Sequence, residues 1–323
     1  MKAAAQHVAA VQVKTRAIAI GIFWIGLCVL LAARAPGFFA FGNLRDMAVT
    51  NAPSLIVAIR MTLVIVAGEI DVSVGSQFAV ASVVAASLAK TGMPLVAVAG
   101  ITAILGAVLG AVNGALVVWL GVPSIVATLA TMAFWRELLR WITQGAWVQG
   151  LPAGFQWMGL GQNAGEAAIL GCAFAIFGAF AWVMRYMQAG RAIYATGSSR
   201  ESARLAGIPV AGVTFGVFIA MGALTGIAAL LDSVRFSEIQ SNAGSGLELK
   251  AISAVVIGGA SITGGKGTLW GTLLGVGVLA VIAPSLTFLG VNAYWEKAIQ
   301  GAIILGAIVL ERAAVSRTVA SAG

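Results

Sequence analysis

Long stretches without a charged residue are the feature that most restricts what this chain can fold into. Such runs cover residues 91–135, 141–165, 205–231 and 267–295. A transmembrane α-helix needs about 20 consecutive apolar residues. The chain has 323 residues, of which 19 are Lys or Arg and 11 are Asp or Glu, whereas charged residues make up roughly 25% of a soluble protein. These observations exclude soluble and disordered proteins and predict a polytopic membrane protein.

We expect an all-α bundle of about ten transmembrane helices that forms a single transmembrane domain over residues 1–323. The Gly-Val-Pro sequence at 121–123 breaks the longest run, because proline and glycine favour helix ends. The predicted spans lie near residues 17–33, 47–67, 73–89, 94–119, 122–142, 166–184, 211–231, 248–263, 268–289 and 294–310. Little of the chain is left for an extramembrane domain.

The distribution of arginines predicts the orientation. Residues 141–184 contain no Lys or Arg, whereas residues 185–204 contain four arginines. Cytoplasmic loops of membrane proteins are enriched in basic residues, so we expect the loop of about 185–210 in the cytoplasm. With ten spans, both termini are then cytoplasmic. The net charge of +8 comes from scattered residues at helix ends, which predicts contact with lipid headgroups and no nucleic-acid partner.

The loop itself contains the pattern of a complete short helix at 198–206. Ser198 and Glu201 form a capping box, Glu201 can pair with Arg204, and Gly207 suits the position after the last helical residue. Such a short helix is marginal in water, so it must dock on something. It is either a coupling helix that inserts into a cytoplasmic partner or a surface helix whose arginines contact lipid phosphates. The residues assigned to a coupling role are Ser198, Arg200, Glu201, Arg204, Leu205 and Gly207.

Two glycine-rich segments at 68–76 and 258–268 follow apolar stretches. Both have glycines seven residues apart, which indicates an internal duplication of the kind found in transporters. The second segment lacks the spacing of a phosphate-binding loop, so we expect no nucleotide or other cofactor on this chain. The motif residues assigned a structural role are Gly68, Asp71, Ser73, Gly75, Ser76, Gly258, Gly259, Gly264 and Gly265.

Polar residues within the predicted spans are candidates for a transport pathway. Arg60 must face another helix or a wet cavity, or its helix must be broken nearby, because Arg60 and Glu69 would lie on opposite faces of a continuous helix. Asp71 is expected to cap or anchor a helix end at the cytoplasmic surface rather than to bind substrate. Uncharged polar side chains could instead form interhelical hydrogen bonds. The candidate pathway residues are Asn51, Arg60, Asn113, Thr128 and Thr131.

Signals for enzymatic chemistry are weak. The only histidine is His7, and the sequence has no zinc-binding pair, no intramembrane aspartate dyad and no Gly-x-Ser-x-Gly motif. We therefore predict no metal site and no catalytic residue. An intramembrane enzyme is the least favoured function.

Four blocks of sequence resemble a known family. Residues 68–76, Gly-Glu-Ile-Asp-Val-Ser-Val-Gly-Ser, resemble its hallmark Gly-Gly-Ile-Asp-Leu-Ser-Val-Gly-Ser. Asn-Gly at 113–114 followed by 122–129 is similar to a second block, and the segments 197–208 and 251–267 are similar to two more. The blocks occur in the same order as in permease subunits of bacterial ATP-binding-cassette (ABC) sugar importers, a group that includes the ribose, rhamnose and autoinducer-2 permeases.

The resemblance implies a bacterial inner-membrane protein that works with a second permease, identical or paralogous, with cytoplasmic ATPases that hold ATP and Mg²⁺, and with an extracytoplasmic sugar-binding protein. It favours the coupling role of the 198–206 helix. The segment 147–152 resembles the rhamnose and autoinducer-2 branch, which implies a deoxysugar or a similar small polyol as substrate. Arg60 and Glu69 depart from the family, which usually has a small residue at each position.

A secondary transporter driven by an ion gradient is the alternative function. In that case Arg60, Glu69 and Asp71 would be the ion-linked groups within the membrane. Such a protein would transport its solute without an ATPase.

Overall fold

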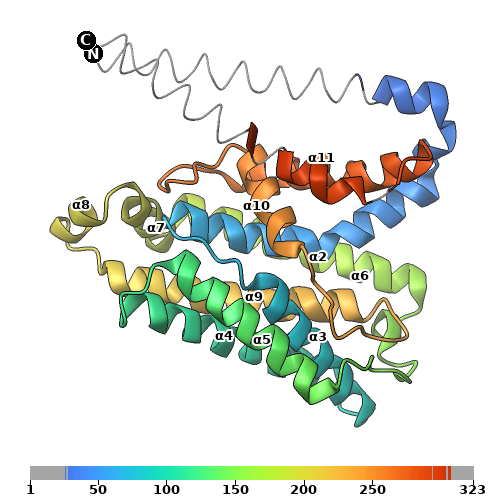
Figure 1. Ribbon diagram of the computed structural model, residues 1–323, viewed down its shortest axis with the longest axis horizontal. Helices are drawn as coiled ribbons and strands as arrows, with labels where there is room; N and C mark the ends of the chain where they lie inside the picture. The colour runs from blue at the N-terminus through green and yellow to red at the C-terminus, as the bar shows by residue number, and fades with distance from the viewer. Residues whose placement is uncertain (1–25, 27, 293, 303–304, 307–323) are drawn as a thin grey trace. The chain divides into compact units, whose positions relative to one another are not determined.

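The computed structural model of the protein describes Gly26 and residues 28–292, 294–302 and 305–306. These residues are helical apart from turns, loops and one isolated antiparallel bridge. In chain order the elements are η1 (Pro36–Phe39), α2 (Phe41–Val66), α3 (Val74–Lys90), α4 (Leu95–Val118), α5 (Ser124–Thr143), η2 (Gln156–Gly159), α6 (Gln162–Tyr186), α7 (Gln188–Ser198), α8 (Arg200–Leu205), α9 (Val210–Ser233), α10 (Leu247–Ile257) and α11 (Leu269–Phe288). The all-α fold class is therefore confirmed (Figure 1).

Five of these helices, α2, α4, α6, α9 and α11, are long and apolar enough to cross a membrane. The predicted break at 121–123 separates α4 from α5, as expected. The first predicted span, 17–33, and the tenth, 294–310, lie largely or partly outside the described residues. The count of ten spans therefore stays a prediction.

The chain divides into two compact units. The first combines the described residues up to Met47 with those from Gly277 onward, and the second comprises Ala48–Val276. In the first unit, Phe38 is buried and its ring meets the ring of Phe288 edge to face at 5.6 Å between centroids. The second unit holds all the polar networks described below.

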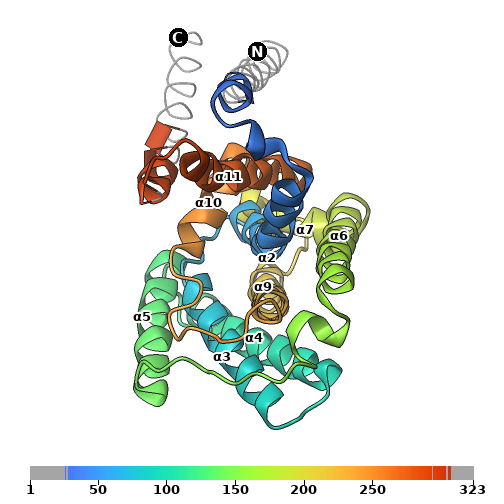
Figure 2. The ribbon, with the colours of Figure 1, turned by 90° about the vertical axis from the view of Figure 1, so that its right-hand side faces the viewer.

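Within the second unit, α9 lies between α2 and α4 (Figure 2). Helices α4 and α9 approach very closely, because glycines face backbone across the contact. A Cβ on Gly106 or Gly110 would overlap the backbone of α9, and a Cβ on Gly222 or Gly226 would overlap the backbone of α4. Small residues allow this packing where lipid supplies no hydrophobic drive between helices. The four-residue glycine spacing thus reflects close packing.

The connection between α2 and α3 is not helical. Gly68 has a φ of +81°, and its amide and that of Glu69 donate to the carbonyls of Ile65 and Val64. This pattern is a Schellman motif, which ends a helix with glycine in the left-handed region. Residues 67–73, which we call the broken-span segment, then lead to α3 (Figure 1); every second residue from Ala67 to Ser73 is buried, whereas Gly68 is exposed.

Two expected helix boundaries differ from the structure. The helix predicted at 248–263 ends at Ile257, because Gly258 and Gly259 follow, the latter with a φ of +87°. The helix predicted at 198–206 is shorter, covering Arg200–Leu205, and a further helix, α7, precedes it. Both differences arise from glycine and serine positions that allow more than one end point.

We predict that Gly222→Ala lowers the thermal stability of the purified protein, because the new methyl group would overlap the Gly106 backbone. Overpacking of this kind costs about 1–3 kcal/mol. Gly216→Ala, on the same helix with open space around its Cα, should be neutral or stabilising by up to about 1 kcal/mol. Thermal unfolding in detergent compares the two, and equal midpoints would contradict this packing.

Candidate functional site

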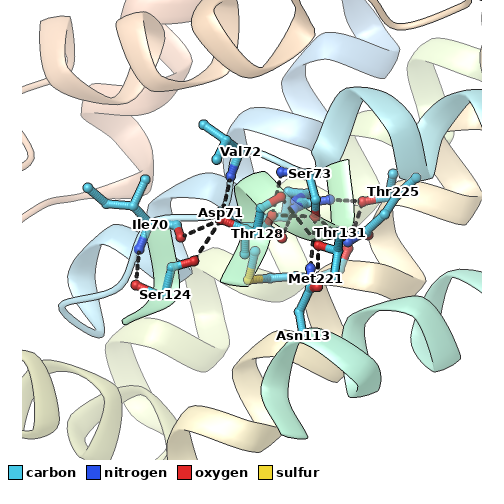
Figure 3. A network of polar contacts seen from close by, with 12 residues as sticks. Ile70, Asp71, Val72, Ser73, Asn113, Ser124, Thr128, Thr131, Met221 and Thr225 are labelled. Carbon is cyan, nitrogen blue, oxygen red and sulfur yellow. Dashed lines mark hydrogen bonds and ion pairs between the residues drawn. The ribbon is translucent and has the colours of Figure 1, made fainter. Parts of the chain in front are cut away.

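A buried ion pair connects the broken-span segment to α2. Arg60 Nη2 lies 2.6 Å from Asp71 Oδ2, and the two side chains are 0% and 1% exposed. Arg60 Nη1 also donates to the hydroxyl of Thr225 on α9 (Figure 3). The sequence placed Arg60 against another helix or beside a helix break, and both conditions hold. Asp71 lies eleven residues after Arg60 and reaches it because α2 ends at Val66 and the chain turns at Gly68.

Asp71 also fixes the start of α3. Its Oδ1 accepts hydrogen bonds from the amide of Ser73 at 2.8 Å and from the Ser73 hydroxyl at 2.6 Å. Asp71 therefore anchors a helix end, as expected, but its side chain is buried and not at a surface. The hydroxyl of Ser76 in the first turn of α3 donates to the Ser73 carbonyl at 2.8 Å.

Ser73 connects Asp71 to side chains of α3 and α4, and through α4 to α5. Its hydroxyl accepts from Gln77 Nε2 at 2.7 Å and from Asn113 Nδ2 at 2.8 Å. The Thr131 hydroxyl in turn donates to Asn113 Oδ1 at 2.7 Å. A continuous chain of hydrogen bonds thus joins α9 and α2 to α5 through the broken-span segment (Figure 3).

Side chains of α5 satisfy the backbone of the same segment. The amides of Ile70 and Val72 donate to the hydroxyls of Ser124 and Thr128, each at 3.2 Å. The Thr128 hydroxyl lies 3.3 Å from the Ile70 carbonyl and 2.8 Å from that of Ser124. Non-helical backbone at membrane depth requires such internal partners. The segment is therefore held in place by specific hydroxyl groups.

The structure brings together four of the five candidate pathway residues. Arg60, Asn113, Thr128 and Thr131 all contact the broken-span segment or a neighbour of it, and all are buried. Asn51 lies apart from them, where its Oδ1 accepts from Lys250 Nζ of α10 at 2.8 Å. The pathway role of the five residues stays a prediction. In the described conformation they pack the interior.

The two glycine-rich segments meet at one place, against the end of α7. A Cβ on Gly264 would crowd Gly68 and the carbonyl of Gly197, and a Cβ on Gly265 would crowd Ser198. The amide of Gly265 donates to the Val66 carbonyl at 2.9 Å. We call this contact of Gly68, Gly197, Gly264 and Gly265 the glycine junction. Only residues without side chains allow three backbone segments to approach so closely.

The remaining motif glycines have separate roles. Gly258 packs against the backbone of Gly271 in α11, whereas Gly259 has open space around its Cα and ends α10. Gly75 in the first turn of α3 lies beside Glu248 Oε2 and the carbonyl of Gly244. These glycines therefore shape the packing around α10.

The N-cap residue of α8 differs from the prediction, whereas the glycine after its last turn is the predicted one. Ser199, and not Ser198, is the N-cap residue, and its hydroxyl accepts from the amide of Ser202 at 3.2 Å. Ser198 is the last residue of α7. At the other end, Gly207 has a φ of +79° and the Ile208 amide donates to the Ala203 carbonyl, which completes a Schellman motif. Two adjacent serines made the cap position ambiguous.

The exposed face of α8 carries both charge and an apolar side chain. Arg204 and Glu201 form the expected i,i+3 pair at 3.1 Å and are 73% and 65% exposed. Leu205 is 79% exposed. Arg200 differs from these residues, because its guanidinium pairs with Glu69 of the broken-span segment. No motif or spacing in the sequence predicted this contact.

Tyr194 of α7 is a further residue that the sequence analysis missed. Its hydroxyl donates to the carbonyl of Gly267 at 2.7 Å. Burial raises the pKa of Tyr194, so the phenol stays protonated and remains a donor at neutral pH. It holds the second glycine-rich segment against α7.

The opposite end of the second unit carries an open cleft of about 450 Å³. The segments before α6 and before α10 meet there, with Val148 and Ile239 forming an antiparallel bridge. The lining residues are Arg140, Gln144, Gly145, Trp147, Gln240, Ser241 and Asn242. Within the described residues, no group of three or more His, Cys, Asp or Glu side chains is placed to hold a metal ion.

Comparisons of the sequence with known proteins found one matching family and several relatives. The family described as "Branched-chain amino acid transport system / permease component" matches residues 43–308. The chain is 35% identical to the "Autoinducer 2 import system permease protein LsrC" of Salmonella typhimurium over 257 residues, 80% of this chain and 74% of the relative. The protein of the same name from Escherichia coli O157:H7 is 33% identical over 290 residues, 88% of this chain and 85% of the relative. No solved structure matches the chain.

We predict that Asp71→Asn destabilises the protein by about 3–5 kcal/mol, because it leaves Arg60 charged and buried without its partner. The double variant Arg60→Met, Asp71→Asn removes both charges and should be more stable than the single variant. Unfolding midpoints in detergent measure the difference. A double variant no more stable than Asp71→Asn would show that the ion pair is not the source of the loss.

Proposed function

The chain belongs to the family of transport-system permease components, and on that premise we propose that it is the membrane-spanning subunit of an ATP-driven importer in the bacterial inner membrane. The family match covers most of the chain. The observation that carries the proposal is the short exposed helix α8, which is held against the polar core of the same unit. ATP would be hydrolysed on a separate subunit that also holds Mg²⁺.

The proposed solute is a small hydroxyl-rich molecule of the autoinducer-2 type. The names of the relatives, which are autoinducer-2 import permeases, support this choice. The chemistry of the core supports it as well, because Asn113, Thr128 and Thr131 offer neutral donors and acceptors that suit hydroxyl groups. Gln77 Oε1 and Arg60 Nε are buried without a hydrogen-bond partner among the described residues, so the network has groups to spare for a rearranged, hydrated state.

We further propose ten spans with both termini in the cytoplasm. Helix α8 lies at the opposite end of the second unit from the connection between α5 and α6 (Figure 1). The positive-inside rule assigns the arginine-rich α7–α8 region to the cytoplasm. The connection between α5 and α6, with its cleft and Trp147, would then face the extracytoplasmic binding protein.

In this proposal the ATPase contacts α8 through its exposed residues Glu201, Arg204 and Leu205. Movement of α7 and α8 would reach the end of α2 and the second glycine-rich segment through the glycine junction. A second permease, identical or paralogous, would complete the pathway. ATP binding would favour one of two arrangements of the pair, and the difference in binding energy between them couples the cycle.

The ion-driven alternative finds less support. It requires Arg60, Glu69 and Asp71 to bind or release an ion during transport. Arg60 pairs with Asp71, and Glu69 pairs with Arg200, so each candidate group already has a partner of opposite charge. These pairs would have to break in every cycle.

We predict that the chain reconstituted in vesicles with its ATPase and binding protein takes up an autoinducer-2-type solute only when ATP is supplied. The chain alone, given a proton or sodium gradient, should show no uptake above that of empty vesicles. Labelled solute retained on filters provides the measurement. Gradient-driven uptake by the chain alone would favour the secondary transporter.

We predict that Glu201→Arg reduces the amount of ATPase that co-purifies with the permease, because it reverses a charge on the exposed face of α8. The protein should still fold, since Glu201 contacts only Arg204 of its own helix. Size-exclusion chromatography checks folding, and quantitative pull-down checks the complex. Full recovery of the ATPase with both Glu201→Arg and Arg204→Glu would contradict the contact.

A further inference from the structure

Helix α8 is attached to the broken-span segment by one ion pair. Arg200 is the first residue of α8, and Glu69 lies 131 residues earlier in the chain. The Glu69 side chain is 5% exposed, whereas that of Arg200 is 55% exposed. A nearly buried carboxylate thus takes an arginine from the surface helix as its partner.

We propose that the Glu69–Arg200 pair transmits the movement of α8 to the polar core of the permease. This inference rests on the proposed function and names the residues that carry the coupling. The pair reaches from the surface helix to Glu69, which lies two residues before Asp71 and four before Ser73. These are the two residues from which the buried network spreads to α2, α3 and α4.

The backbone geometry explains why a force on Glu69 reaches the core. The Glu69 amide is bonded to the Val64 carbonyl at 3.0 Å, and the next amide, that of Ile70, is bonded to Ser124. Two residues of extended chain span at most about 7 Å, so Glu69 cannot move far without shifting Asp71. The Arg60–Asp71 pair and the hydrogen bonds of Ser73 would have to rearrange with it.

Arg200 carries the side-chain contact that joins α8 to the broken-span segment. The glycine junction holds α7, and the extended residue Ser199, with φ −163° and ψ 109°, separates α7 from α8. The Ser199 amide donates to the Ala195 carbonyl of α7 at 3.1 Å, so this second route reaches α8 only through the backbone. Of the six residues of α8, only Ala203 is buried. The Glu201–Arg204 pair joins two residues of the same helix and links α8 to no other segment.

The test uses the complete importer in vesicles and measures solute molecules imported per ATP hydrolysed. Glu69→Gln keeps the size and hydrogen-bonding capacity of the side chain but removes its charge. We expect Glu69→Gln and Arg200→Gln to lower this ratio roughly fivefold or more, the lower end of energetic coupling between two sites, while the ATPase still co-purifies. Arg200→Lys, which keeps the charge, should import more solute per ATP than Arg200→Gln.

Two further variants separate coupling from general damage. The exchange Glu69→Arg with Arg200→Glu reverses the pair and should recover part of the lost ratio. Glu137→Gln removes an exposed i,i+3 pair with Arg140 on α5 and should leave the ratio unchanged. Thermal unfolding of each purified variant shows whether it is folded.

The outcomes distinguish this inference from the proposed function. If the wild-type importer takes up no solute with ATP, the proposed function is wrong. If the wild type imports solute and both Glu69→Gln and Arg200→Gln import it with an unchanged ratio, the function stands and the coupling role of the pair is wrong. If Glu137→Gln lowers the solute imported per ATP as much as Glu69→Gln does, the coupling role of the pair is also wrong.

Discussion

Buried backbone groups need hydrogen-bond partners, and this constraint governs the centre of the protein. The broken-span segment leaves the helical path of α2, so its amides and carbonyls lose the partners that a helix would supply. Hydroxyls of α5 and the carboxylate of Asp71 take up these groups. Asp71 also binds Arg60, and the Thr128 hydroxyl also lies within hydrogen-bond distance of the Ile70 carbonyl. Unpaired backbone groups at the break would destabilise the fold. With these partners, the break instead joins helices α2, α3, α4, α5 and α9.

The same break places Gly68 against α7 and Glu69 against α8. Because α2 ends at Val66 and Gly68 has no side chain, the backbone can pass the glycine junction within van der Waals distance of α7. The next residue, Glu69, then meets α8. The second glycine-rich segment arrives at the same point from α10, and Tyr194 secures it. The two segments with matched glycine spacing therefore meet at one helical connection, which explains the glycines at 68, 264 and 265.

The sequence predicted local features well because their causes are local. Charge-free length and Pro123 defined α4 and α5, and Gly207 defined the end of α8, since helix length and helix ends depend on neighbouring residues. The interior partners were harder. Arg60 was recognised as needing a partner, and the predicted spans 47–67 and 73–89 placed the break where the structure has it, but the pattern did not show that Asp71 turns back to pair with Arg60. The approach of Arg200 to Glu69 leaves no periodic signal at all, because 131 residues separate them.

The account's central claim is that the broken-span segment moves with α8 during transport. Amide hydrogen exchange of a peptide that covers residues 67–73, measured in the assembled importer with and without ATP turnover, tests it directly. Its amides at Ile70, Val72 and Ser73 depend on side-chain partners, so a rearrangement must expose them. We predict faster exchange of this peptide during turnover than at rest. Unchanged protection of the segment while solute is being imported would contradict the account.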